Sequence, residues 1–277
     1  AAVAAPSAAA TAGAREGRAL TAPGPIAASD ELPRRSWASL AALGLLMAPG
    51  TARGAEGAPA DGGSVAVYFG RGSFWRMQHE VTLWSLRASK AGQYPDGAFS
   101  PALAGYAGGQ GKDGDGKICY SSMNGLPYDK MGYAEVVGLQ IPSAALEDMA
   151  TRFFDDLAAG PRKKGPKDGV SSSGFESGGA AYRDVIGLPG GLSSPLLPAL
   201  ERACAGRAKL LPGEGADPDT LDKGAVYIYD VAQFPFNRAE MYHQYHDDVS
   251  QQFSAGYRGL KKRMQQAGLV APIGCAE

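Results

Sequence analysis

The chain has 277 residues, of which 44% are apolar and 20% charged, and its formal net charge is -1 at pH 7. This apolar content suffices for a substantial core in one large or two small domains. The near-neutral charge argues against a nucleic-acid-binding surface and a polybasic membrane patch. Three widely spaced cysteines, with no Cys-x-x-Cys pair, indicate neither a disulfide framework nor a structural zinc site, so the function must be sought in local motifs.

Residues 1–54 have the composition of a targeting segment. They are rich in alanine, serine and proline and contain five arginines and no lysine, as an organelle transit peptide does. Arg34-Arg35 then precedes an apolar run at 37–47 and small residues at 50–55, a pattern typical of a twin-arginine translocation signal. The run is shorter than the ~20 residues that span a bilayer. The two signals predict a bipartite presequence for the chloroplast thylakoid lumen. A disordered alanine-rich tail with an incidental apolar patch is the alternative.

A strand, a glycine loop and a helix follow the Gly/Ala/Pro linker at 55–63. Residues 64–69 form a short, β-branched apolar run typical of a buried strand. Phe74, Met77, Val81 and Trp84 then recur at helical spacing and predict one buried helix face. Ser73 stands at the head of this helix, where unpaired N–H groups and the positive end of the helix dipole stabilise an anion. The local pattern therefore indicates an active-site turn.

The rest of the chain mixes strands with helices and shows no strict βαβ alternation. Strands are predicted within 97–109 and at 134–142, 182–191 and 226–230. Helices are predicted after Ser143, which can cap the first of them, and at 194–205, 237–248 and 250–267. This order indicates an α+β domain with a mixed sheet over 64–248 and a helical extension over 249–277.

Four ordered motifs resemble the peptide-methionine sulfoxide reductase A family. Gly72-Ser73-Phe74-Trp75 is similar to that family's Gly-Cys-Phe-Trp, and residues 105–109 match its Gly-Tyr-x-Gly-Gly. Residues 132–135 stand where the family has Gly-His-Ala-Glu, and residues 179–183 where it has Gly-x-x-Tyr-Arg. Segments at 185–196 and 235–246 resemble a longer subfamily. The resemblance covers most of 64–248 and implies a two-layer sandwich in which helices flank a mixed central sheet.

The resemblance also implies roles for individual residues. Glu135 would be the buried acid, with a raised pKa, that protonates the departing sulfoxide oxygen. Tyr106 and Tyr182 would hold that oxygen, and Phe74 and Trp75 would form the apolar pocket for the methyl group. The substrates would be methionine sulfoxide side chains of proteins. No bound cofactor is implied, and an active enzyme would use thioredoxin or another dithiol reductant.

Two departures from the family pattern predict that the activity is lost or severely impaired. Ser73 replaces the nucleophilic cysteine, whose ordinary pKa is ~8.5, whereas a serine hydroxyl is too weak an acid to react without an adjacent base. His79, the nearest histidine in sequence, lies about 9 Å along the predicted helix and on another face. Ser177 stands where the family has an aspartate five residues before the motif tyrosine.

The remaining cysteines and histidines add no second site at this level. Cys275 stands where family members often keep a recycling thiol on a mobile tail, but without a sulfenic acid it has nothing to resolve. Cys119 and Cys204 are interpreted as buried small hydrophobic residues. His243 and His246 would share a helix face, yet no third ligand is apparent, so no metal is predicted.

Two functions follow from these observations. The first is a pseudoenzyme of the thylakoid lumen that binds methionine or methionine sulfoxide side chains, as an auxiliary or structural subunit of a photosynthetic membrane complex. The alternative is an active peptide-methionine (S)-S-oxide reductase, an oxidoreductase that repairs oxidised methionines under oxidative stress. Neither function involves nucleic acid or a transmembrane span in the mature chain.

Overall fold

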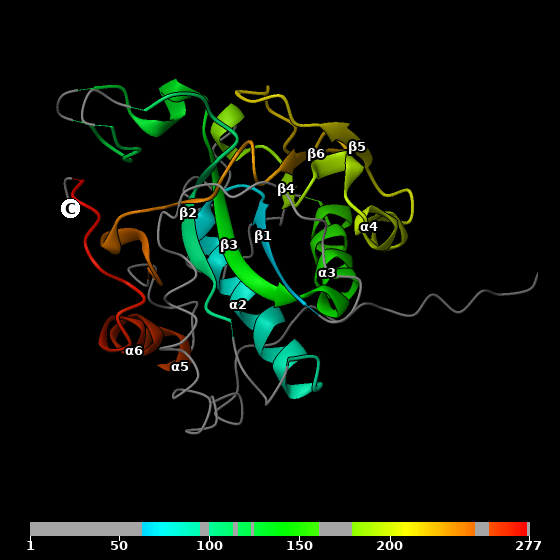
Figure 1. Cartoon of the computed structure of the whole chain (residues 1–277), viewed down its shortest axis with the longest axis horizontal. Coiled ribbons are helices and arrows are strands. Elements are labelled where there is room, and N and C mark those ends of the chain that lie inside the picture. Colours follow the sequence, from blue (N-terminus) through cyan, green and yellow to red (C-terminus); the bar gives the residue numbers. More distant parts are fainter. Residues whose placement is uncertain are drawn as a thin grey trace, which may run out of the picture.

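A mixed seven-stranded sheet forms the centre of the protein (Figure 1). The computed structural model describes residues 63–94, 100–112, 116–122, 125–160, 179–246 and 255–275. The strands are β1 (Ser64–Gly70), β2 (Leu103–Ala107), β3 (Ala134–Pro142), β4 (Val185–Leu188), β5 (Lys209–Pro212), β6 (Ala225–Asp230) and β7 (Asn237–Arg238). Their order is β5-β6-β4-β1-β3-β2-β7. The β5-β6 and β6-β4 pairs are parallel and the others antiparallel. The predicted α+β class with a mixed sheet is confirmed.

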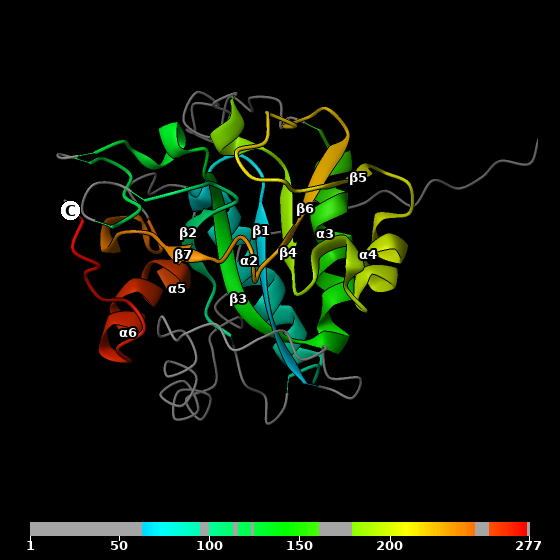
Figure 2. The same cartoon turned by 45° about the horizontal axis from the view of Figure 1, so that its top comes forward.

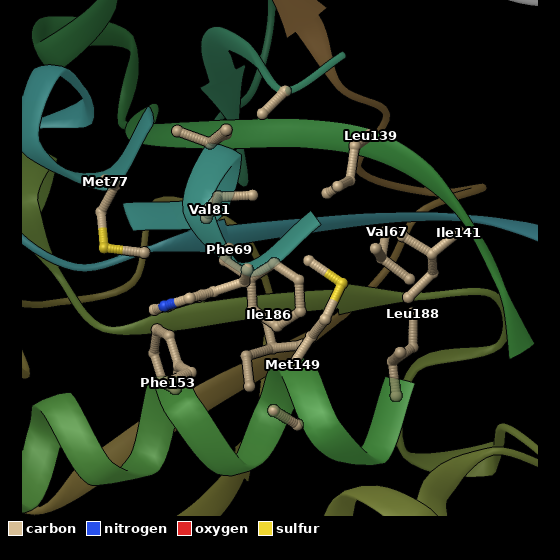
Figure 3. Packing of buried hydrophobic residues seen from close by; sticks show 14 of the residues in the cluster. Val67, Phe69, Met77, Val81, Leu139, Ile141, Met149, Phe153, Ile186 and Leu188 are labelled. Carbon is tan, nitrogen blue, oxygen red and sulfur yellow. The ribbon is translucent and has the colours of Figure 1, made fainter. Parts of the chain in front are cut away.

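Two long helices, α2 (Phe74–Lys90) and α3 (Leu146–Ala158), cover one face of this sheet, and α4 (Leu197–Cys204) packs against α3. Successive side chains of a strand point to opposite faces, so alternate residues of each strand reach the helices. Figure 3 shows the resulting core, in which side chains from the strands interdigitate with those of α2 and α3: Val67, Phe69, Leu139, Ile141, Ile186, Leu188, Met77, Val81, Met149 and Phe153.

The opposite face of the sheet is covered by the segment that leads into β7. Tyr68, Val136 and Tyr229 pack there with Phe234 and Phe236. This approach needs a glycine in β2, because a Cβ on Gly105 would lie 2.3 Å from the Phe236 ring and from the Asn237 carbonyl oxygen. The chain can therefore pair β7 with β2 at the sheet edge (Figure 2).

The C-terminal residues form a separate small cluster beside this edge. Short helices α5 (Ala255–Arg258) and α6 (Leu260–Gln266) bring Tyr257, Leu260 and Met264 against Leu103 of β2 and Tyr245. No helix in the described ranges has both the length and the apolar character needed to cross a bilayer. The predicted presequence at 1–54 lies outside the described residues.

Two local predictions are wrong, and one strand was missed. Within the predicted helix 237–248, the described residues 237–246 form no α-helix. They start with β7, and the Ala239 N–H donates to the Ala104 carbonyl oxygen at 2.9 Å, so pairing with β2 overrides the helical pattern. Ser143 opens a 3-10 turn before α3 instead of capping the helix. Strand β5 was not predicted, since it is only four residues long and both of its end residues are exposed.

A buried ion-pair network fixes the junction between β1 and α2. The Arg71 side chain is 5% exposed, and its guanidinium lies 2.9 Å from Asp184, 2.7 Å from Asp222 and 3.3 Å from Asp156. Asp156, on α3, also lies 3.0 Å from Arg76 on α2. The loop after β1 is thereby tied to α3 and to the start of β4.

Replacing Arg71 with leucine is expected to lower the free energy of unfolding by roughly 3–5 kcal/mol, because the substitution leaves the buried Asp184 carboxylate without its counter-charge. Arg152→Leu, which breaks the partly exposed pair with Asp148 within α3, is the matched control and should cost less than about 1 kcal/mol. Denaturant unfolding measures both values. Equal losses in the two variants would contradict the structural role given to Arg71.

Candidate functional site

The start of α2 forms the centre of the candidate site. Gly72 has a φ of 61°, which a residue with a side chain rarely adopts, and its N–H donates to the Tyr182 carbonyl oxygen at 3.0 Å. Ser73 is the N-cap residue, and its Oγ accepts a hydrogen bond from the Trp75 N–H at 3.3 Å. The loop therefore places Ser73 at the helix N-terminus with the Tyr182 backbone beside it.

Glu135 lies beneath this helix start. It is 2% exposed and belongs to β3, directly opposite Tyr106 of β2. One carboxyl oxygen accepts a hydrogen bond from the Phe74 N–H at 2.8 Å, and the other from the Tyr128 hydroxyl at 2.8 Å. Burial raises the pKa of Glu135 to about 7, against the opposing effect of hydrogen bonds from Phe74, Tyr128 and Ser73. The carboxyl group is therefore suited to give or take a proton near neutral pH.

A second buried carboxylate, that of Glu240, holds Tyr106. The Tyr106 hydroxyl donates to Glu240 Oε2 at 2.7 Å, and the Tyr106 ring stacks on Tyr128 with centroids 4.6 Å apart. The hydroxyl that the resemblance assigns to the sulfoxide oxygen is thus bonded to Glu240, while Tyr128 contacts the carboxyl group of Glu135. Tyr128, in a 3-10 turn, belongs to none of the sequence motifs. Glu240 lies within the matched segment 235–246, but the motif assigned it no role.

Tyr182 and Tyr120 extend this group of phenols. Tyr182 ends a 3-10 turn at Ala180–Tyr182 and is half-buried. Burial raises the pKa of Tyr120 to about 12, with further contributions from Glu135 and Tyr182. Tyr128 bonds to Glu135, and the rings of Tyr106 and Tyr120 pack on Tyr128 with centroids 4.6 Å and 5.3 Å away, so these three phenols form one group beside Glu135.

Aromatic side chains continue from the helix start to the surface. The Phe74 ring lies 5.0 Å from His243, and the half-buried Trp75 stacks on His246 with centroids 3.7 Å apart. The Trp75 Nε1–H donates to His243 Nδ1 at 3.2 Å. Burial lowers the pKa of His243 to about 4, so the imidazole is neutral and accepts this bond. Tyr120 and Tyr242, which are 40% and 45% exposed, both pack on His243.

The cysteines differ from the sequence-based expectation. Cys119 and Cys275 form a disulfide across 156 residues, so the expectation of no disulfide was wrong, and Cys119 is not a free buried thiol. Cys275, considered as a resolving thiol, is bonded to Cys119. Cys204 is free and buried, as interpreted. The expectation that His243 and His246 share a helix face is also wrong. His243 ends a 3-10 turn at Met241–His243, and His246 follows it.

The structure brings together Ser73, Phe74, Trp75, Tyr106, Glu135 and Tyr182, the residues that the motifs selected. Ser177 lies outside the described residues. The His79 ring packs on Tyr257, with centroids 4.9 Å apart.

No protein-family model matches the sequence, and no curated protein matches it either. Among solved structures, the chain is similar to methionine sulfoxide reductase A of Corynebacterium diphtheriae. The match covers 74% of this chain and 80% of that chain, with a TM-score of 0.38 and 16% sequence identity. Similarity at this level does not decide the function, which therefore has to be argued from the site itself.

The raised pKa of Glu135 predicts a pH-dependent stability. Because the folded protein binds this proton more tightly than a chain with the ordinary pKa of 4.5, stability should fall as the pH rises from 4.5 to about 7. The change amounts to roughly 3 kcal/mol at ~1.4 kcal/mol per pKa unit. Glu135→Gln should remove it and the exposed Glu147→Gln should not, as measured by denaturant unfolding across this pH range. An unchanged slope in Glu135→Gln would refute the assignment.

Tyr128→Phe is expected to raise the pKa of Glu135 further, since it removes a hydrogen bond that favours the carboxylate. The titration can be followed by the carboxyl stretching band in infrared difference spectra against Glu135→Gln. Tyr133→Phe is the control, because the Tyr133 hydroxyl donates to the Gly111 carbonyl oxygen instead. A pKa that stays constant in Tyr128→Phe would show that this bond does not tune Glu135.

Proposed function

We propose that this protein binds methionine or methionine sulfoxide side chains at the N-terminus of α2 and has little or no reductase activity. The observation that carries the proposal is the arrangement at Glu135. A buried carboxyl group with a pKa of about 7 lies between the Phe74 N–H and the Tyr128 hydroxyl, next to Ser73. This arrangement can protonate or hydrogen-bond a sulfoxide oxygen at the helix start.

The site lacks the nucleophile that sulfoxide reduction requires. Attack on a sulfoxide sulfur needs a soft nucleophile, and a thiolate at a helix N-terminus supplies one, whereas a serine hydroxyl does not. None of the three cysteines takes that place, since Cys119 and Cys275 are joined to each other and Cys204 is buried in α4. Proton transfer from Glu135 alone does not break the sulfur–oxygen bond.

The binding half is supported by the aromatic side chains. A methionine sulfur gains about 0.3–1.5 kcal/mol from contact with an aromatic ring. The half-buried Trp75 offers such a ring at the helix start, with the buried Phe74 ring behind it, and Tyr120 and Tyr242 carry the aromatic surface out to solvent. Because burial lowers the pKa of His243 to about 4, its imidazole adds no charge to this surface. A protein segment that presents methionine suits this surface.

The place of action is part of the same proposal. The presequence pattern at 1–54 supports delivery to the thylakoid lumen, where the partner would be a methionine-containing segment of a photosynthetic membrane complex. An active reductase that uses thioredoxin or another dithiol reductant is the alternative, and the turnover assay separates the two.

The mature domain should show no measurable turnover of a methionine-sulfoxide peptide with a dithiol reductant. Ser73→Cys should introduce turnover, because a thiolate then stands beside Glu135, and Ser73→Cys/Ser177→Asp should increase it. Ser73→Ala is the matched control and should resemble the wild type. A wild-type rate equal to that of the double variant would refute the inactive assignment.

Binding can be measured separately through tryptophan fluorescence and calorimetry with methionine and methionine-sulfoxide peptides. We expect a fluorescence change that is lost in Trp75→Phe and kept in Trp84→Phe, because Trp84 is buried in the core between α2 and the sheet. Trp75→Ala should weaken binding by about tenfold or more. The absence of both heat and fluorescence change in the wild type would remove the binding function from this site.

A further inference from the structure

We infer that Cys119, Cys275 and Glu240 form a site for a soft divalent cation such as Zn²⁺ when the two cysteines are reduced. The three side chains come from three segments that are distant in sequence, and their ligand atoms lie within 4.8 Å of one another. Cys119 is 3% exposed and Glu240 is 1% exposed. This cluster is separate from Glu135 and Ser73, and the inference does not depend on the proposed binding function.

The two cysteines are held close by bonds other than their disulfide. The Cys119 carbonyl oxygen accepts a hydrogen bond from the Tyr128 N–H at 3.0 Å. On the other side, the Arg238 guanidinium donates to the carbonyl oxygens of Leu269 at 3.1 Å and Ala271 at 3.2 Å. Lys117 donates to the Gly274 carbonyl oxygen at 2.5 Å. Reduction therefore leaves the C-terminal segment tied to the segment between β2 and β3, which it approaches in Figure 1.

The third ligand is also oriented in advance. Glu240 Oε1 accepts a hydrogen bond from the Tyr120 N–H at 2.6 Å, and Oε2 accepts one from the Tyr106 hydroxyl at 2.7 Å. A carboxylate has about four lone-pair sites, so both bonds can persist beside a metal ion. Hydrogen bonds of this kind orient metal-binding carboxylates and strengthen their affinity.

The donor set selects the class of metal. Two thiolates and one carboxylate suit Zn²⁺, Cd²⁺ or Co²⁺ better than Ca²⁺ or Mg²⁺, which prefer oxygen ligands only. Three protein ligands leave a fourth tetrahedral position for water. The ammonium group of Lys117, bonded to the residue before Cys275, offsets part of the negative charge of this set.

Access to the site requires a balanced redox step. A dithiol reductant gives two electrons and two protons to the Cys119–Cys275 disulfide and becomes a disulfide itself. The two thiols then release two protons as their sulfurs bind the cation. The disulfide and the metal-bound state exclude each other, because they use the same sulfur atoms. Glu240 contacts Tyr106 and Tyr120, so the change between the disulfide and the metal-bound state is connected to the aromatic side chains beside Glu135.

The test is a Co²⁺ titration of the whole protein after reduction with a phosphine and anaerobic removal of the reductant. We expect one equivalent to bind, with thiolate-to-cobalt charge-transfer absorption and tetrahedral d–d bands, and Zn²⁺ to displace it. The oxidised protein should show neither band. Cys119→Ser and Cys275→Ser should abolish the charge-transfer signal or weaken binding by at least tenfold, and Glu240→Gln should weaken binding by about 10-fold or more.

Cys204→Ser is the matched control and should bind Co²⁺ like the reduced wild type, since Cys204 lies apart in α4. Circular dichroism of each variant without metal confirms that it is folded. Equal Co²⁺ spectra in the reduced and oxidised proteins would overturn the site. Binding that survives in Cys119→Ser and Cys275→Ser, or that is unchanged in a folded Glu240→Gln, would overturn the ligand assignment. The titration reads the metal directly, so its failure leaves the binding function of the α2 site to its own assays.

Discussion

The hydrogen bond from the Phe74 N–H to Glu135 joins the first helix to the central sheet, and the site depends on it. A helix N-terminus leaves its first N–H groups without partners. Here the Glu135 carboxyl group accepts a hydrogen bond from the Phe74 N–H, and the Ser73 hydroxyl accepts one from the Trp75 N–H. Strand β3 supplies Glu135, and strand β1 leads into the loop before Ser73, so the pairing of β1 with β3 brings both groups to one end of the sheet. The buried network around Arg71 then holds the loop between them.

Sulfoxide reduction combines three requirements, and this site holds groups suited to two of them. The raised pKa of Glu135 gives a proton donor near neutral pH, and the aromatic rings at Phe74 and Trp75 suit a methionine side chain. A soft nucleophile is a third requirement, and a hydroxyl group stands in its place. Under the proposed function, what remains at the helix start binds the side chain without converting it.

The disulfide gives the same region a second chemistry. Cys275 is joined to Cys119, the residue before Tyr120, and Tyr120 donates its N–H to Glu240 while its ring packs on Tyr128 and His243. The C-terminal segment is thus coupled to the phenols beside Glu135. In the proposed reduced state, a metal ion on the two sulfur atoms would share Glu240 with Tyr106 and with the Tyr120 N–H.

The sequence by itself determined the local features: the mixed α+β order, the strand–loop–helix junction, and the placement of Ser73 at the helix start, because apolar spacing and glycine position depend on neighbours along the chain. Only the tertiary structure decided that Tyr128 contacts Glu135, that Glu240 holds Tyr106, and that Cys119 meets Cys275 over 156 residues. It also turned the helical pattern after residue 237 into an edge strand, since β2 offered hydrogen bonds and a glycine that admits Phe236. These outcomes rest on contacts between distant segments, which no local periodicity encodes.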